Sequence, residues 1–289
     1  MMDRVLFVKG HGTGNDFVIL PDPDGTLELT PALVTALCDR HRGIGADGVL
    51  RVVRSAKHPF AAGLAADAEW FMDYWNTDGS IAEMCGNGVR VFARYLVDNG
   101  LATPGEAGLP IATRAGVVVA VIGSPTISVR MRSPSGYAVS TATIGPLSLP
   151  GVVVDCGNPH LVCRLPESAD LSTLDLHVAP GFDPKVFPHG VNVEFVSSVP
   201  SGDGPYVRMR VYERGSGETL SCGSGALAVG AVALRDAGLD SGTVIVDVPG
   251  GRLTVTHEGD DWWLAGPAVL VAAGGVDLSA LGADPEALG

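Results

Sequence analysis

The sequence predicts an α+β protein made of two related halves, each with several β-strands and one buried helix. Its 289 residues, 46% of them hydrophobic, are enough for one large domain or two ordinary ones with real cores. An internal repeat favours two domains, because CGNGVRVFARYLVDNGL from Cys85 resembles CGSGALAVGAVALRDAGL from Cys222, 222 − 85 = 137 positions later. Short β-branched runs broken by Gly and Pro surround both copies and are typical of strands.

Each copy of the repeat predicts a helix with a cysteine at its amino end. In both copies a Gly-polar-Gly run opens an apolar stretch of helix length, and Gly100 and Gly238 are well placed as the C′ residues that follow the helices. The second stretch is apolar on nearly every side, which indicates a helix enclosed by other structure.

The strands and the domain limits come from shorter patterns. Strands are predicted over residues 116–122, 126–131, 152–155, 206–211 and 243–248. GNDFVIL also resembles GNPHLVC, and GADGVLRVV resembles PHGVNVEFV, in the same order in both halves. We therefore predict an N-terminal domain over residues 1–131, a C-terminal domain over 132–265, and a segment, 266–289, that returns to the first domain.

The composition favours small molecules as ligands. The formal charge of −13 and the absence of any Lys or Arg run argue against nucleic acid and against an anionic membrane surface. No stretch reaches the ~18 apolar residues of a membrane span, and MMDRVLFVKGHG lacks the apolar core of a signal peptide. The five cysteines lack the paired spacing of a secreted disulfide framework, so we expect a cytoplasmic protein.

A cysteine at the amino end of a helix can be chemically reactive. The unpaired N–H groups there attract anions and are expected to lower the pKa of the thiol below its free value of ~8.5. The glycines after Cys85 and Cys222 leave the backbone amides open to a carboxylate. Inverting a stereocentre needs a base on one face and an acid on the other, because a single group returns the proton to the side it left. Two half-sites supply that pair, so the repeat predicts a two-thiol epimerase or racemase.

Other interpretations stay open at this point. Buried cysteines are often small hydrophobes, and two thiols can also form a redox pair or a sensor. The run GHGTGND continues into a strand rather than a helix, which disfavours a dinucleotide site. Cys156, His160 and Cys163 lack a familiar zinc spacing, and no lysine lies in a setting typical of pyridoxal phosphate. We therefore predict no cofactor and no metal.

Six longer motifs occur in order along the chain. They are GTGNDF, YWNTDGSIAEMCGNG, GNPH, GVNVEF, YERGSGET and SCGSG. Together they resemble the diaminopimelate epimerase family. The resemblance implies two pseudo-symmetric domains, each a curved mixed β-sheet wrapped around a central helix. It also implies a homodimer that converts LL-2,6-diaminopimelate to meso-2,6-diaminopimelate in lysine and peptidoglycan precursor biosynthesis.

The resemblance assigns roles to particular residues. Cys85 and Cys222 match the acid/base pair, and we expect Cys222 to accept and Cys85 to donate a proton in the LL to meso direction. His160 and Glu213 match positions beside the thiols and are expected to take part in catalysis by shaping proton traffic or thiolate stability. The expected substrate-binding residues are Asn15, Asn76, Gly86, Asn87, Asn158, Asn192, Glu213, Arg214, Gly223 and Ser224.

One position departs from the family pattern, and two other functions stay open. Gly48 lies where many relatives carry a glutamine that contacts substrate, so the full set of distal contacts does not carry over. A proline or hydroxyproline racemase would use the same thiol chemistry, but such enzymes usually carry a histidine where this chain has Asn87. A non-catalytic amino-acid-binding or thiol-sensing protein would bind its ligand without exchanging the α-proton.

Overall fold

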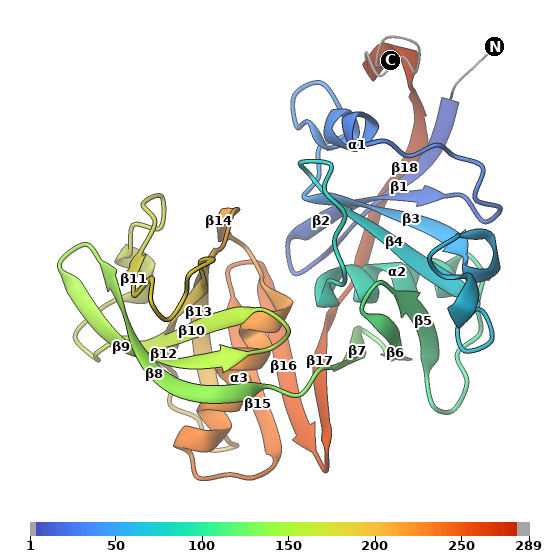
Figure 1. Cartoon of the computed structure of the whole chain (residues 1–289). Helices are drawn as coiled ribbons and strands as arrows, with labels where there is room; N and C mark the ends of the chain where they lie inside the picture. Colours follow the sequence, from blue (N-terminus) through green and yellow to red (C-terminus); the bar gives the residue numbers. More distant parts are fainter. Residues whose placement is uncertain (1–3, 282–289) are drawn as a thin grey trace. The chain divides into compact units, whose positions relative to one another are not determined.

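The computed structural model describes residues 4–281, and the chain divides into two compact units. Unit 1 is Met1–Val129 with Pro267–Gly289, and unit 2 is Arg130–Gly266. Residues 1–3 and 282–289, which fall in the predicted first domain and its returning segment, lie outside the described residues. Mixed sheets with few helices confirm the predicted α+β class (Figure 1).

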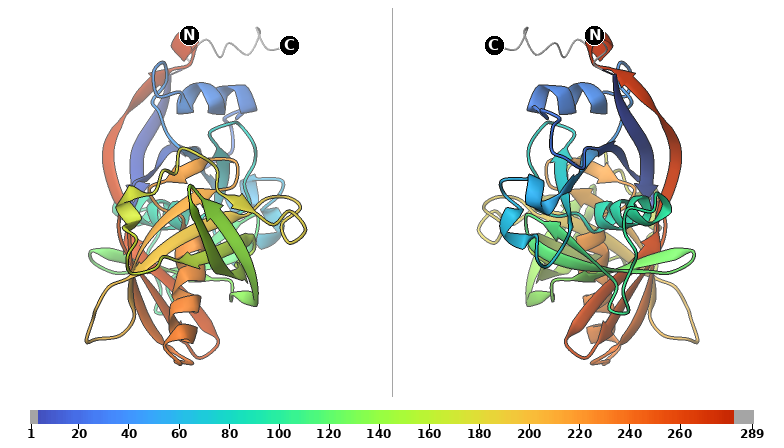
Figure 2. Two further views of the ribbon diagram at one scale, coloured as in Figure 1. Left: turned by 90° about the vertical axis from the view of Figure 1, so that its left-hand side faces the viewer. Right: turned by 90° about the vertical axis from the view of Figure 1, so that its right-hand side faces the viewer.

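Unit 1 is a mixed sheet packed around helix α2 (Gly86–Asp98). The helix contacts strands β1 to β6 and also β18, which comes from the far end of the chain. Strand β18 pairs antiparallel with β1, and the two strands lie side by side in both views of Figure 2. The strands are β1 (Arg4–Gly12), β2 (Asn15–Pro21), β3 (Gly48–Arg54), β4 (Trp70–Asn76), β5 (Leu109–Thr113), β6 (Gly116–Ile122), β7 (Thr126–Met131), whose last two residues belong to unit 2, and β18 (Val269–Asp277). The other helices are α1 (Pro31–Cys38) and the 3-10 helices η1 (Ser55–Lys57), η2 (Ala62–Leu64) and η4 (Ser279–Leu281).

Unit 2 repeats this plan around helix α3 (Gly223–Asp236). The helix contacts β9, β10, β12, β13, β15 and β16. The strands are β8 (Ser135–Ile144), β9 (Leu147–Asp155), β10 (Pro159–Arg164), β11 (Gly181–Phe182), β12 (Asn192–Ser198), β13 (Tyr206–Glu213), β14 (Gly217–Thr219), β15 (Gly242–Val248), β16 (Gly251–Glu258) and β17 (Asp261–Pro267). A 3-10 helix, η3, covers Leu171–Thr173.

The two predicted helices are confirmed. Cys85 is the N-cap of α2 and Cys222 is the N-cap of α3. Gly100 and Gly238 follow the two carboxyl ends with φ values of 66° and 68°, in the left-handed region that glycine adopts without cost. Strands β6 and β7 have the predicted limits, whereas β9, β13 and β15 are longer than their predicted cores.

Corresponding strands have the same order and register in the two units. In unit 1, β2 lies parallel to β3 with Phe17 opposite Gly48, and β4 runs antiparallel on the other side of β3. In unit 2, β10 lies parallel to β12 with His160 opposite Asn192, and β13 is the antiparallel neighbour. The register therefore makes Phe17 equivalent to His160 and Gly48 equivalent to Asn192. The sequence match of GADGVLRVV with PHGVNVEFV was wrong by one residue, because it paired Gly48 with Val191.

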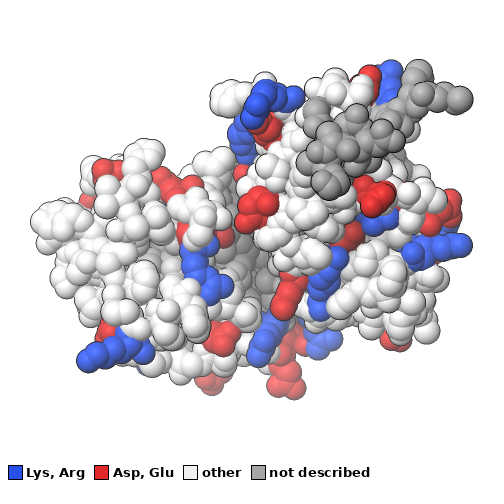
Figure 3. Space-filling view, turned by 45° about the horizontal axis from the view of Figure 1, so that its top comes forward, with Lys and Arg blue, Asp and Glu red and all other residues white. Residues whose placement is uncertain are grey.

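The surface has mixed charge. On the face shown in Figure 3, Lys and Arg side chains lie among Asp and Glu side chains instead of gathering apart from them. Within residues 4–281, no helix combines the length and the apolar character needed to cross a membrane.

Candidate active site

The unit 2 half-site is centred on Cys222 at the first turn of α3. The Gly225 amide donates to Cys222 Sγ at 3.4 Å, and Ser224 Oγ lies 3.6 Å from the same sulfur. The sulfur therefore occupies the place that a Ser, Thr or Asp side chain usually takes at a helix N-cap. The Cys222 side chain is buried, with 6% of the residue exposed.

The expected lowering of the thiol pKa is wrong for Cys222. Burial raises its pKa well above the ordinary value, and the nearby carboxyl groups of Glu213 and Glu194 raise it further. The hydrogen bonds from Ser224 and Gly225 lower the pKa, but their effect is smaller. Desolvation and the two nearby carboxyl groups therefore outweigh the helix end, and they favour the thiol form of Cys222.

Alkylation of Cys222 by iodoacetamide should reveal this raised pKa. In a Cys85→Ala variant, we expect the rate to reach half its maximum above about pH 8.5, the value for a free thiol, because only the thiolate reacts. Mass spectrometry of the peptide that contains Cys222 gives the rate, and the urea-unfolded chain is the control. A midpoint at neutral pH in the folded protein would contradict the assignment.

Polar side chains from the ends of three strands surround this turn. Glu213, at the end of β13, accepts a hydrogen bond from Thr219 Oγ1 and interacts with the Cys222 thiol, while desolvation raises its pKa. Asn192 Oδ1 accepts from the Arg214 amide at 2.9 Å, and Asn192 Nδ2 donates to the Pro159 carbonyl at 3.0 Å. The structure thus brings the predicted residue Glu213 to the Cys222 thiol, and the predicted residue Asn192 to the amide of Arg214, which follows Glu213 in the chain.

A buried His-Glu pair completes the unit 2 half-site. His160 Nδ1 lies 2.6 Å from Glu194 Oε1, and His160 Nε2 lies 3.0 Å from Asn158 Oδ1. Both His160 and Glu194 are 0% exposed. Sequence reasoning found His160 and Asn158 but missed Glu194, whose only signal was an acidic residue between the apolar residues Val193 and Phe195.

The unit 1 half-site is centred on Cys85 at the first turn of α2. The Gly88 amide donates to Cys85 Sγ at 3.4 Å, and Cys85 Sγ in turn donates to Asn15 Oδ1 at 3.6 Å. Asn87 Nδ2 also donates to Asn15 Oδ1, at 3.2 Å. Asn15 Nδ2 donates to Asp47 Oδ2 at 2.9 Å. Asp47 was not predicted as a site residue. By accepting from Asn15 Nδ2, it leaves Asn15 Oδ1 directed toward the Cys85 sulfur.

The charge beside the two cysteines has opposite sign. Arg90 is fully buried on α2, donates to Asn87 Oδ1 at 2.9 Å, and interacts electrostatically with Cys85. Burial lowers the pKa of the Arg90 guanidinium to about 10. The matching residue on α3, five positions after Cys222, is Leu227. A cation therefore accompanies Cys85, whereas carboxyl groups accompany Cys222.

Two predicted residues have looser settings. Asn76, at the end of β4, donates to Ser80 Oγ at 3.0 Å in the turn that follows. Arg214 is exposed, and its Nη1 donates to the His189 carbonyl at 3.3 Å. Each side chain lies at a strand end next to its half-site, where it can turn toward a ligand.

Gly48 lies where a side chain does not fit. A Cβ atom there would lie 2.5 Å from the Trp75 carbonyl oxygen and 2.8 Å from Tyr74 Cε2. The close approach of β4 therefore disfavours a side chain at Gly48, including the glutamine that the resemblance led us to consider there. In unit 2 the equivalent position holds Asn192, whose side chain makes hydrogen bonds to Pro159 and Arg214. Gly48 has no side chain to make such hydrogen bonds, so the two half-sites differ here.

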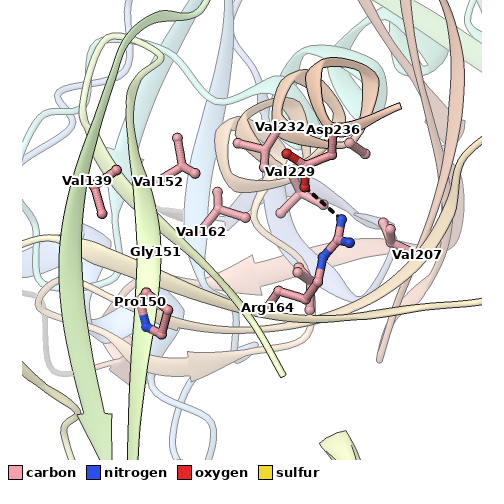
Figure 4. A pocket seen from close by; sticks show the side chains of 12 residues that line it. Val139, Pro150, Gly151, Val152, Val162, Arg164, Val207, Val229, Val232 and Asp236 are labelled. Carbon is pink, nitrogen blue, oxygen red and sulfur yellow. Dashed lines mark hydrogen bonds and ion pairs between the residues drawn. The ribbon is translucent and has the colours of Figure 1, made fainter. Parts of the chain in front are cut away.

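Unit 2 also contains a cavity that is separate from its half-site. It has a volume of about 230 Å³ and lies between α3 and strands β8 to β10 (Figure 4). Its walls are mainly valine side chains, and an ion pair of 2.8 Å between Arg164 and Asp236 crosses it. None of the predicted site residues lines this cavity.

Among residues 4–281, no three His, Cys, Asp or Glu side chains are grouped to hold a metal ion.

Comparison with known proteins identifies the family. The family model described as diaminopimelate epimerase matches residues 7–135 and 152–276. A diaminopimelate epimerase from Streptomyces coelicolor is 51% identical over 291 residues, covering 96% of this chain and 97% of the relative. One from Rhodococcus opacus is 50% identical over 286 residues, covering 94% of this chain and 97% of the relative.

A solved structure shows the same fold at much lower identity. The Bacillus anthracis phenazine biosynthesis protein of the PhzF family has a TM-score of 0.70 and 19% identity, covering 95% of this chain and 99% of its own. At this identity the likeness concerns the fold alone. The family model and the two relatives extend over both cysteine turns and nearly the whole chain, and they show that the chain belongs to the diaminopimelate epimerase family.

Proposed function

We propose that this chain is an isomerase that converts LL-2,6-diaminopimelate to meso-2,6-diaminopimelate, a step of lysine and peptidoglycan precursor biosynthesis. The observation that carries the proposal is the pair of N-cap cysteines, Cys85 and Cys222, each followed by glycines that leave the helix-end amides open. Relatives that are about half identical over nearly the full chain support the choice of substrate.

The two cysteines act from opposite faces of one α-carbon. In the LL to meso direction, the Cys222 thiolate removes the α-proton, and the electron pair of the C–H bond moves into the substrate carboxylate as an enolate. Cys85 then gives its S–H proton to the other face. The step leaves Cys222 as a thiol and Cys85 as a thiolate, so the reverse reaction uses the same pair in exchanged roles.

Forming the Cys222 thiolate is the costly part of this cycle, since burial and two carboxyl groups raise the pKa of its thiol. Glu213 interacts directly with that thiol, and desolvation also raises the pKa of its carboxyl group. A carboxylate that is more basic than usual is well suited to take the thiol proton when substrate binds. Glu213 therefore acts as the proton acceptor for Cys222.

The remaining residues hold the substrate. The amides at Gly86, Asn87, Gly223 and Ser224 bind the reacting carboxylate and stabilise the enolate, because helix amino ends favour negative charge. Arg214 can form two parallel hydrogen bonds to the distal carboxylate. The side chains that complete the polar set are Asn15, Asn76, Asn158, Asn192 and Glu213.

Proton NMR in deuterated buffer tests the function directly. With LL-diaminopimelate and the reduced protein, we expect the α-proton signal to disappear while the meso isomer forms. Exchange with proline or hydroxyproline instead would move the assignment to a racemase of that type. Tight binding without exchange of any α-proton would indicate a non-catalytic binding protein.

We also propose that the chain is a cytoplasmic homodimer. The family resemblance supports the dimer, and the five cysteines without the paired spacing of a disulfide framework support the cytoplasm. Light scattering should give twice the chain mass of 29.7 kDa.

A further inference from the structure

The first turns of the two helices pack against different kinds of side chain. The third residue after each cysteine is a glycine that faces the strands beneath the helix. A Cβ atom at Gly88 would lie 3.4 Å from Leu50 Cδ2 and 3.6 Å from Phe17 Cζ. A Cβ atom at Gly225 would lie 2.7 Å from Glu194 Oε1. An apolar pair therefore supports one cysteine turn, and an ionisable group supports the other.

These two pairs occupy equivalent positions in the two units. Phe17 is opposite Gly48 in the parallel pair β2 and β3, and Leu50 lies two residues after Gly48. His160 is opposite Asn192 in the parallel pair β10 and β12, and Glu194 lies two residues after Asn192. The fold thus accepts Phe and Leu at the same places where unit 2 carries His and Glu.

Stability does not account for the His-Glu pair. Both side chains are fully buried, and Glu194 Oε2 has no hydrogen-bond partner among the described residues. Replacing a buried ionic pair with well-packed apolar residues is often neutral or stabilising. Unit 1 has the apolar residues Phe17 and Leu50 at the equivalent positions. The His160–Glu194 pair in unit 2 therefore points to a functional role.

The contacts of the pair define that role. Asn158 Oδ1 is an amide oxygen and can only accept, so the hydrogen bond of 3.0 Å requires a proton on His160 Nε2. Glu194 lies 2.6 Å from the other ring nitrogen, Nδ1. As a carboxylate it accepts from Nδ1–H of a cationic ring, whose charge it balances and which also carries a proton on Nε2, and as a carboxylic acid it donates to bare Nδ1 of a neutral ring. Nε2 keeps its proton in both states, so Glu194 holds the ring in the form that binds Asn158 Oδ1.

The side-chain amides of Asn15 and Asn158, which are equivalent in the two half-sites, consequently have opposite orientations. Asn15 uses its Nδ2 to donate to Asp47, which leaves its Oδ1 facing the Cys85 sulfur. Asn158 uses its Oδ1 to accept from His160, which leaves its Nδ2 to donate. One half-site therefore presents an acceptor to its thiol, and the other presents a donor suited to a carboxylate or an enolate.

We propose that Glu194 is a positioning residue, which acts through His160 to orient the Asn158 amide so that its Nδ2 donates to the substrate carboxylate. The proposal rests on the proposed function. Glu194 itself touches neither the substrate nor the reacting atoms. The His160–Glu194 pair thus makes one half-site present a hydrogen-bond donor where the other half-site presents an acceptor.

A double variant, His160→Phe with Glu194→Leu, tests this by placing the unit 1 pair in unit 2. We expect it to melt at or above the wild-type temperature, while kcat/KM falls by about 10- to 100-fold, mainly through a higher KM. Glu194→Gln is the conservative variant, since its amide can donate to Nδ1 and preserve the Nε2 proton, and it should stay within about tenfold of wild type. Leu50→Met is the matched control, because it changes the unit 1 residue that is equivalent to Glu194. Wild-type KM and kcat/KM in the folded double variant would overturn the proposal.

Nitrogen NMR of the histidine ring gives a second readout that does not depend on turnover. In the wild type and in Glu194→Gln, we expect a protonated Nε2 on His160. An unprotonated Nε2 in the wild type would refute the positioning role even if diaminopimelate is epimerised. Conversely, a protonated Nε2 in a protein that fails to turn over diaminopimelate would count against the proposed function only.

Discussion

Replacing either Cys85 or Cys222 with alanine is expected to lower the rate of α-carbon inversion by about 10²- to 10⁴-fold, the usual contribution of a positioned acid or base. The physical reason is directional, because one thiol can return a proton only to the face from which it came. Each single variant should therefore lose inversion, while the remaining thiol exchanges the α-proton of at most one isomer with retention of configuration. Chiral chromatography together with deuterium incorporation separates these two outcomes.

A third cysteine provides the control for this experiment. Cys38 lies in unit 1 and is buried, with 2% exposed, but it ends α1 and packs in an apolar cluster. Cys38→Ala should cost stability without changing the turnover of the folded protein. Near wild-type inversion by Cys85→Ala or Cys222→Ala would show that the two-thiol mechanism is wrong.

Replacing Asp73 with alanine is expected to lower the free energy of unfolding by about 3–5 kcal/mol, as is usual when one partner of a buried ion pair is lost. Asp73, on β4, is 1% exposed and accepts from Arg114 Nη2 at 2.6 Å and from Trp75 Nε1 at 2.9 Å. Arg51 Nη1 lies 3.5 Å from its second oxygen. Alanine would remove the carboxylate that pairs with Arg114 and would leave Arg51 with Asp22, whose Oδ2 lies 2.6 Å from Arg51 Nη2.

Urea unfolding followed by circular dichroism measures this loss. The matched control is Asp98→Ala in the same unit, where the pair between Arg94 and Asp98 is exposed and the two atoms are 3.5 Å apart. That change should cost less than about 1 kcal/mol, because water screens an exposed pair. Equal losses in both variants would mean that the buried network does not stabilise unit 1.

The internal repeat made much of this structure predictable from the sequence. The Cys-Gly-polar-Gly runs and the glycines at positions 100 and 238 predicted both central helices, and two of the predicted strands have the limits of β6 and β7. These patterns succeed because capping and apolar periodicity act over a few neighbouring residues. Helix α1 was not predicted, although Thr30 at its N-cap accepts a hydrogen bond from the Leu33 amide at 3.2 Å and Pro31 begins its first turn. Its eight residues are too few for a clear apolar period.

The sequence by itself determined the fold class, the two cysteine turns and the residues that resemble a family's site. The tertiary structure decided the electrostatics of that site. It placed Glu194 and Glu213 beside Cys222, and Arg90 beside Cys85, which reversed the expected pKa shift of the Cys222 thiol. Burial and charge depend on side chains that are distant in the sequence and meet only when the strands pair, so no local pattern contains them.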